Sequence, residues 1–499
     1  MTVYLDIGAK RIQAYLARTS RLRGRRGASA LLEYEMLRDW TKGAWSGHAQ
    51  INEEGKQTDG VLSLSFTNPD VDDRTVDDVV TETSTLLQRL APGAEWDVLV
   101  RQADSYRQAQ HDDAVAQRAG QDLLPNGGLR YRPLPVAPNE VPVVRSCETC
   151  GLDSAVLAVR TEYLEPDEAD GDKKVSLCAD CSRRFLEGGH RTDARNWDEA
   201  RRRWQQKIAP GGLDAERKLR VGVEQLKGLS ASTLRVARDF SDLAALGSGD
   251  ANHLCTVFAD GNRFGDLFKA LKDSKVSLRN LSGDLTKAVR GALITATAAV
   301  TREKDTCLPV VPHLVGGDDL LASVTAERAW DFVVAFLDDY HQRTNVLATD
   351  YQERAGVLVP PPTASAGLVF AHATYPFADC LDLAETALRR AKSRHKALEP
   401  AVCWVDVTED GPELPLSRAA PSLAELAKHR TNIDNLGDIP PSGRARLAEA
   451  AQYDDTEVAA QAYRLGHMDL IRPFLQPKAP MPLVDALILG RWWQCRQTG

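Results

Sequence analysis

Apolar residues in the first third of the chain recur with two different periods. Short alternating or continuous apolar stretches predict strands, and apolar residues three or four positions apart predict helices. The predicted strands are residues 1–7, 60–66 and 95–101, and the predicted helices are residues 11–32 and 76–90. Because strands and helices alternate, we expect a compact α+β domain over residues 1–140.

The same mixture of periods returns in residues 248–410, where we predict a second α+β domain. Its predicted strands are residues 254–259, 308–315, 363–370 and 401–407, and its predicted helices are residues 266–272, 285–300, 326–341 and 377–396. The strand at 308–315 returns through Val324, so these two segments predict a β-hairpin. This order of elements resembles the ferredoxin-like palm domain of nucleotide polymerases and cyclases.

The remaining regions have their own character. Residues 196–247 are charged with a helical period, which predicts a helical connector. Residues 411–499 start with a proline-containing linker and continue with helical patterns, so we expect a C-terminal helical domain. We expect Trp492 and Trp493, near its end, to pack in a core rather than to face a partner.

The tip of the predicted hairpin reads Gly316-Gly317-Asp318-Asp319. Glycine and aspartate are common in tight turns, so the tip alone predicts no more than a turn. Asp260 changes this interpretation, because it ends a strand that the palm arrangement places beside the hairpin. Carboxylates from two neighbouring strands can hold two Mg²⁺ ions roughly 4 Å apart for nucleotidyl transfer. We therefore predict that Asp260, Asp318 and Asp319 are catalytic magnesium ligands.

Small residues around these acids are consistent with a bound nucleotide. Gly316 and Gly317 carry no side chain that would block a base or a sugar. After Asp260, the chain continues Gly261-Asn262-Arg263-Phe264-Gly265 and opens a predicted helix whose free N–H groups can bind phosphate. The same letters also suit an ordinary turn. The predicted nucleotide-binding residues are Gly261, Asn262, Gly265, Gly316 and Gly317.

Two pairs of cysteines lie between the two α+β domains, in residues 141–195. Cys147 and Cys150 form one C-x-x-C knuckle, and Cys178 and Cys181 form the other. Four thiolates at such spacing predict a closed, tetrahedral, structural Zn²⁺ site. Two unrelated thiol pairs and a redox motif are the alternatives. A four-sulfur site has no open position, so we assign it no catalysis.

Composition narrows the possible partners. The chain has 499 residues and a formal net charge of −8, which argues against a general nucleic-acid coat and leaves only local contacts. Basic residues gather in residues 10–26, as either a solvated helix face or a phosphate-binding surface. No apolar run approaches the ~20 residues that cross a bilayer, and no signal-peptide pattern is present. We expect a cytoplasmic protein without membrane contact, and the nine cysteines indicate no disulfide framework.

Several motifs in combination resemble the large palm-domain subunit of type III CRISPR effector complexes. They are the segment from Asp260 to Gly265, the hairpin tip, the strand Ser365-Ala366-Gly367-Leu368-Val369 with His372 and Pro376, and the pair Ala391-Lys392. Residues 12–32 are similar to the first palm of that family, and the cysteine pairs fit its zinc region. The resemblance covers residues 1–410.

The resemblance implies a function. The second palm would polymerise ATP into cyclic oligoadenylate messengers for antiviral defence when the complex binds target RNA. On the motif match, Ser365 would contact the nucleotide and Lys392 would bind its triphosphate. Implied partners are ATP, guide or target RNA and other effector-complex subunits, with a homodimer as an option. The first palm would be catalytically silent.

Two departures refine this interpretation. The tract 384–392 also resembles the late helix of diguanylate cyclases, but those enzymes carry Glu and Phe where this chain has Asp319 and Leu320. Family members often begin with an HD nuclease domain, whereas this sequence starts at the first palm. We therefore expect a reduced form of the family without that domain. Two alternatives stay open. One is a non-catalytic, RNA-binding scaffold subunit of an RNA-guided complex, and the other is a cyclase that makes a different cyclic nucleotide.

Overall fold

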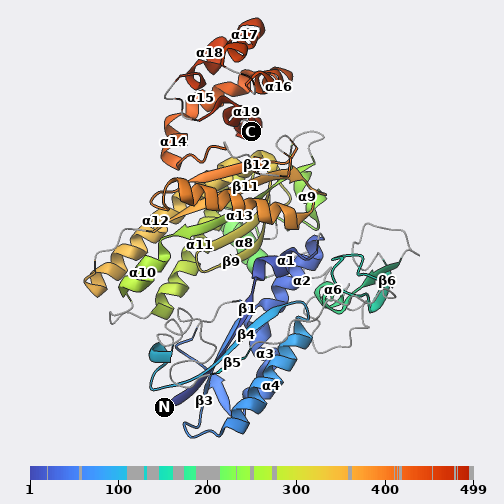
Figure 1. Ribbon diagram of the computed structural model, residues 1–499, viewed down its shortest axis with the longest axis vertical. Helices are drawn as coiled ribbons and strands as arrows, with labels where there is room; N and C mark the ends of the chain where they lie inside the picture. Colours follow the sequence, from blue (N-terminus) through green and yellow to red (C-terminus); the bar gives the residue numbers. More distant parts are fainter. Residues whose placement is uncertain are drawn as a thin grey trace. The chain divides into compact units, whose positions relative to one another are not determined.

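The computed structural model in Figure 1 divides into two units, Met1–Lys207 and Ile208–Gly499. It describes the chain except for residues 20, 56–58, 110–128, 132–144, 161–173, 187–213, 232, 248–251, 272–277, 358–361, 409–410, 413, 415–417, 452, 454, 477–478, 480 and 494–499. Residues 196–213 and 232 of the predicted connector, and Cys495, therefore lie outside the described residues.

A five-stranded sheet forms the centre of the first unit. Its strands run in the order β2 (Ala49–Ile51), β3 (Val61–Phe66), β1 (Thr2–Lys10), β4 (Glu95–Ala103) and β5 (Leu129–Tyr131), and every neighbouring pair is antiparallel. The central strand β1 buries Leu5 and Ile7 completely. The apolar pattern therefore predicted β1, β3 and β4 correctly. It did not predict β2 and β5, which have three residues each.

The helices of the first unit differ from the predicted ones in two respects. The predicted helix over residues 11–32 is broken into α1 (Ile12–Ala17) and α2 (Leu22–Leu32), and α3 (Tyr34–Trp45) was not predicted. The helix α4 (Asp73–Leu90) agrees with its prediction and is capped by Asp72, which accepts a hydrogen bond from the Thr75 N–H. Arg23, Arg25 and Arg26 on α2 are buried, so a solvated helix face is the wrong interpretation for them.

The cysteine region is a small substructure of the first unit. Strands β6 (Leu157–Arg160) and β7 (Lys174–Leu177) pair antiparallel, and α6 (Ala179–Phe185) follows directly. The helix α6 packs against α2. The core of the substructure consists of the cysteines together with Val159, Val175, Leu177, Phe185 and Leu186.

The second unit contains another five-stranded sheet. Its order is β12 (Val402–Asp406), β11 (Thr363–His372), β8 (His253–Asn262), β10 (Asp319–Thr325) and β9 (Val310–Gly316). The pair β11–β12 is parallel and the others are antiparallel. Its helices are α8 (Asp214–Leu226), α9 (Phe240–Ala244), α10 (Phe264–Leu271), α11 (Leu278–Val300), α12 (Ala329–Ala355) and α13 (Phe377–Arg394). Figure 1 shows α12 and α13 beside this sheet.

The two sheets share one topology. When β1 to β5 are matched in chain order with β8 to β12, the two sheets have the same order of strands. They differ in one strand pair, because β4–β5 is antiparallel and β11–β12 is parallel. The predicted α+β class with two palm-like sheets and a four-cysteine insert is confirmed.

Short helices follow the second sheet. They are α14 (Leu423–Lys428), α15 (Arg430–Asn435), α16 (Pro441–Ala450), α17 (Asp455–Leu465), α18 (Met468–Ile471) and α19 (Leu483–Trp493). Trp492 and Trp493 are buried, as predicted. The Trp492 ring stacks on Phe370 with centroids 5.2 Å apart, and its Nε1–H donates to Asp406 at 2.7 Å. Within the described residues, none of the helices has the length and apolarity of a membrane span.

Candidate functional site

The glycine-aspartate tip is a tight turn between β9 and β10. Gly316 and Asp319 face each other in the ladder, so Gly317 and Asp318 form a two-residue loop. Gly317 has a φ of 63°, a left-handed conformation that glycine adopts without strain. Glycine at the first loop position suits a type II′ hairpin turn. The conformation of the turn therefore accounts for glycine at position 317, and the turn places Asp318 and Asp319 at the end of the hairpin.

The third acid reaches the tip through the pairing of β8 with β10. These strands are antiparallel, with Leu320 opposite Ala259, so Asp260 lies one residue beyond this pair, next to Asp319. One carboxylate oxygen from each of Asp260, Asp318 and Asp319 lies within 4.8 Å of the others. These three residues are called the acid cluster below. Carboxylate oxygens are hard ligands of the kind that Mg²⁺ prefers.

Crowding of the acid cluster changes its protonation. Burial, and then the charge of Asp260, raise the pKa of Asp318 to about 6. Burial and the hydrogen bond and charge of Asp260 raise the pKa of Asp319 to about 9. Carboxylates held this close cannot all be charged without a compensating cation. A divalent metal would relieve this repulsion, so the donor set fits Mg²⁺.

Lys392 is the cation that the structure brings to the acid cluster. It lies in the last turn of α13, and its Nζ forms an ion pair with Asp260 and donates to the Gly261 carbonyl at 2.8 Å. The side chain is 22% exposed, so it is not the solvated surface lysine that a helix position alone suggests. The ammonium group thus lies beside the acid cluster and neutralises part of its charge.

Asn262 and Ser365 lie behind the acid cluster rather than on its surface. Both side chains are buried. The Asn262 amide donates to the Thr363 hydroxyl at 2.9 Å, to the Ser365 hydroxyl at 3.0 Å and to the Glu399 carbonyl at 3.3 Å. These bonds join β8 to β11 next to Asp260. Their geometry is that of residues that position the strand end.

The glycines of the site fall into two groups. A Cβ atom at Gly261 would overlap the Phe264 ring and lie 2.7 Å from the Asp318 carboxylate, so close packing requires glycine there. Gly265, Gly316 and Gly317 have no atom within 4 Å of such a Cβ position. The second group therefore borders open space beside the acids, as a nucleotide site requires.

Tyr340 is a residue near the acid cluster that the sequence analysis missed. It lies on α12 and is fully buried, and its hydroxyl has no hydrogen-bond partner within the described structure. Burial, and then the charges of Asp318, Asp260 and Asp319, raise its pKa well above the usual value. It follows Phe336 and Leu337 by one turn on the buried side of a helix, as a core tyrosine would, so periodicity gives no functional signal for it.

The shared topology shows what the first sheet has at the equivalent positions. Lys10 pairs with Glu95, the first residue of β4, and Asn262 pairs with Thr363, the first residue of β11. Lys10 and Asn262 are therefore equivalent positions in the two sheets. This register places Gly8 where Asp260 lies. It also places Val61, the first residue of β3, where Asp319 lies. The first sheet thus has no carboxylate at these two positions.

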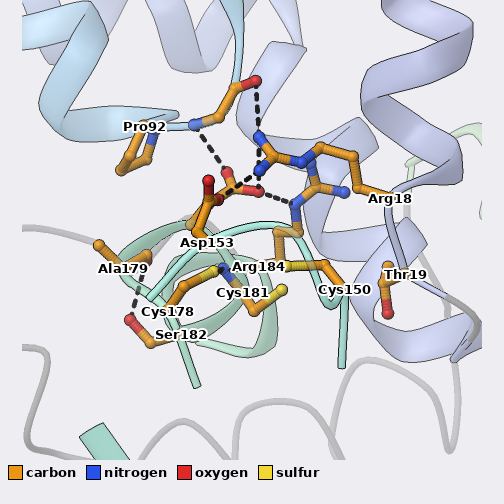
Figure 2. A network of polar contacts seen from close by, with 12 residues as sticks. Arg18, Thr19, Pro92, Cys150, Asp153, Cys178, Ala179, Cys181, Ser182 and Arg184 are labelled. Atoms are coloured by element: carbon orange, nitrogen blue, oxygen red, sulfur yellow. Dashed lines mark hydrogen bonds and ion pairs between the residues drawn. The ribbon is translucent and has the colours of Figure 1, made fainter. Parts of the chain in front are cut away.

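The four predicted zinc ligands also meet. The sulfur atoms of Cys147, Cys150, Cys178 and Cys181, called the cysteine cluster below, all lie within 4.8 Å of one another. Sulfurs about 2.3 Å from a tetrahedral zinc are separated by about 3.8 Å. The distance between the sulfurs of Cys150 and Cys178 is 3.8 Å. The cluster therefore has the size of a zinc tetrathiolate. Figure 2 shows three of its members, Cys150, Cys178 and Cys181.

The chemistry of this donor set also fits a metal. Hydrogen bonds with the other three sulfurs lower the pKa of Cys147, whereas hydrogen bonds with its own three neighbours raise the pKa of Cys181. The cause is mutual, because ionisation of one sulfur opposes ionisation of the next. A bound cation would allow all four to be thiolates.

Comparison with known proteins finds a similar family for the part of the chain that contains the acid cluster. Residues 253–398 match the family model described as Cas10/Cmr2, second palm domain. This range contains the acid cluster and Lys392. The resemblance expected from the motifs is confirmed here. No curated protein matches the chain by sequence.

Solved structures show a similar fold at low sequence identity. A Csm1-Csm4 cassette in complex with pppApA aligns with a TM-score of 0.50 at 13% identity, over 99% of this chain and 69% of that chain. The Csm1-Csm4 cassette in complex with cA4 gives 0.49, 12%, 99% and 70%, and Csm1 in T.onnurineus gives 0.48, 12%, 99% and 69%. At such identity the first similarity is evidence for the fold alone.

Proposed function

We propose that this chain, a Cas10-like protein with a second palm domain of the Cas10/Cmr2 kind, is a magnesium-dependent nucleotidyltransferase that polymerises ATP into cyclic oligoadenylate. The observation that carries the proposal is the meeting of Asp260, Asp318 and Asp319 at a glycine-lined hairpin end. We take residues 248–410 as the catalytic domain and the first palm, over residues 1–140, as silent.

Each residue of the site has a defined task in this reaction. The acid cluster would hold Mg²⁺, which when bound lowers the pKa of an attacking 3′-hydroxyl and neutralises triphosphate charge. Lys392 would bind triphosphate from the α13 side, after exchanging its contact with Asp260 for phosphate oxygens. Asn262 and Ser365 would keep the end of β8 in register, so that Asp260 stays aligned with the hairpin.

The nucleotide itself would lie over the open side of the turn. Gly316 and Gly317 leave space there, and the backbone of Gly265 lies in the first turn of α10, where N–H groups lack partners within the helix. Positive partial charge at this helix end favours phosphate. ATP rather than GTP is proposed because a Csm1-Csm4 cassette of similar fold was solved with pppApA.

The proposed setting is an RNA-guided effector complex in antiviral defence. A similar solved structure is a Csm1-Csm4 cassette, so we propose effector subunits as partners. Guide or target RNA is proposed as a further partner on the motif resemblance. The cysteine cluster would hold a structural Zn²⁺, and no membrane contact is proposed. A homodimer is a further arrangement that the reaction is compatible with.

A non-catalytic scaffold is the second candidate, and one observation favours it. The Lys392 ammonium already neutralises Asp260, so the acid cluster is partly compensated without metal. In a scaffold, this ion pair would be permanent and Mg²⁺ would not replace it. The two candidates therefore differ in whether nucleotide and metal enter the cluster.

Product analysis separates the candidates. The purified full chain is incubated with radiolabelled ATP or GTP and Mg²⁺, with and without RNA and effector subunits, and the products are resolved by chromatography. We expect oligoadenylate from ATP that disappears when EDTA is added. Product from GTP alone would identify a different cyclase, and no product in any condition, with ATP failing to protect Lys392 from acetylation, would leave the scaffold.

A further inference from the structure

A buried charge network joins the two cysteine knuckles to the first palm. Arg18 follows α1, and its side chain is 15% exposed. Its guanidinium donates to the Gly93 carbonyl at 3.0 Å and forms an ion pair with Asp153, three residues after Cys150. The same group lies 3.7 Å from a carboxylate oxygen of Asp180, which stands between Cys178 and Cys181. Figure 2 shows Arg18 and Asp153 in one network beside the cysteines.

Each knuckle therefore contributes one carboxylate to the same arginine. Asp180 is 2% exposed and also accepts from the Gly93 N–H at 3.0 Å and from Arg184 Nε at 2.7 Å. Backbone hydrogen bonds such as Glu148 N–H to the Ser176 carbonyl, at 2.9 Å, already join the two knuckles, and a metal bound to all four sulfurs would fix the distance between them further. The two carboxylates that contact Arg18 come from different knuckles, so a metal that joins the knuckles would also hold these carboxylates at one distance.

We propose that Arg18 is a positioning residue that couples zinc binding in the cysteine cluster to docking of the knuckles on α1 and α2. Zinc brings Asp153 and Asp180 together, and Arg18 then ties both to the Gly93 carbonyl. Charged hydrogen bonds of this kind around a metal site orient its ligands. The inference concerns zinc and the first palm, so it does not depend on the proposed nucleotidyl transfer.

The contact between α6 and the palm helices is close enough to transmit this effect. The Arg184 guanidinium lies 3.9 Å from the centroid of the Tyr15 ring on α1, and Arg23 on α2 donates to the Phe185 carbonyl at 3.1 Å. A Cβ atom at Gly27 would overlap the Arg184 carbonyl, so α2 and α6 meet backbone to backbone. An interface this tight leaves little tolerance for a shifted knuckle.

The first test needs no substitution. Hydrogen exchange by mass spectrometry compares the full chain before and after zinc is removed with a chelator, with metal content measured in both samples. We expect faster exchange in α1, α2 and the segment around Gly93, in addition to residues 147–186, and unchanged exchange in β8 to β12. Faster exchange confined to residues 147–186 would overturn the coupling.

The second test measures zinc release to a chromogenic chelator. Arg18→Met should release zinc about 10-fold faster than the natural chain, in line with other outer contacts of metal sites, and Arg18→Lys should fall between them. Arg38→Met is the matched control, because the Arg38–Asp39 ion pair is largely exposed and lies on α3. Release at the natural rate from Arg18→Met would refute the proposal.

A milder variant covers the case in which Arg18→Met does not fold. Asp153→Asn keeps the shape of a side chain that is 36% exposed and removes only its charge from the pair with Arg18. We expect faster zinc release from this variant as well. Unchanged release, together with unchanged exchange in α1, would count against Arg18 as the link.

Discussion

At the scale of single residues, the two acids of the hairpin tip hold protons unusually strongly. The pKa of Asp318 is raised to about 6 and that of Asp319 to about 9, in both cases chiefly by burial. Near neutral pH the metal-free acid cluster therefore holds a proton. Metal ligation requires the carboxylate form, so Mg²⁺ must displace this proton.

This protonation predicts the pH dependence of metal binding. Raising the pH from 6 to 9 removes protons that compete with Mg²⁺, so apparent Mg²⁺ affinity should rise across this range and level off above about pH 9. Isothermal titration calorimetry in two buffers of different ionisation enthalpy measures both affinity and proton release. Asp319→Asn should bind weakly with a flatter pH profile. Equal affinity of the natural chain at pH 6 and pH 9 would contradict the assigned ligands.

At the scale of elements, α13 positions Lys392 because β11 lets it approach closely. A Cβ atom at Gly367 on β11 would overlap the Ala384 carbonyl and lie 2.7 Å from the Leu388 nitrogen, both on α13. The obstacle is backbone, which cannot rotate away. The glycine therefore sets the separation between the helix and the sheet.

Alanine at Gly367 should consequently destabilise the second unit. We expect Gly367→Ala to lower the free energy of unfolding by about 1–3 kcal/mol through overpacking. Gly283→Ala on α11 is the opposite control, since no atom lies within 4 Å of its Cβ position, and helix propensity predicts a gain of roughly 0.5–1 kcal/mol. Urea unfolding of both variants gives the two values. Equal effects would show that the α13 contact is not tight.

Some of the elements could be predicted from the sequence pattern and others could not. The hairpin and its neighbour β8 were predictable, because a long apolar period and turn residues point to one arrangement. The break between α1 and α2 was not predictable, because it falls at Arg18, whose ion pairs are with carboxylates distant in sequence. The contact of Lys392 with Asp260 was not predictable and Tyr340 was missed for a similar reason. Periodicity assigns a residue to a face of a helix but does not indicate what that face contacts.

At the scale of the whole molecule, one topology occurs twice with different chemistry. The acid cluster belongs to the second sheet, whereas Gly8 and Val61 take two of its positions in the first. The turn region also repeats a rare backbone feature. Arg11 after β1 and Arg263 after β8 both have positive φ, at 48° and 63°. The repeated architecture thus keeps its backbone while only one copy has the predicted metal ligands.

This difference provides the most direct test of the central claim. Asp319→Asn removes one carboxylate from the hairpin of the second palm, and Glu54→Gln removes one from the corresponding β2–β3 hairpin of the first palm. Oligoadenylate formation from ATP and Mg²⁺ is measured for both under the conditions in which the natural chain is active. The account predicts a loss of at least about 100-fold for Asp319→Asn and unchanged synthesis for Glu54→Gln. Full activity of Asp319→Asn, or an equal loss in both variants, would contradict it.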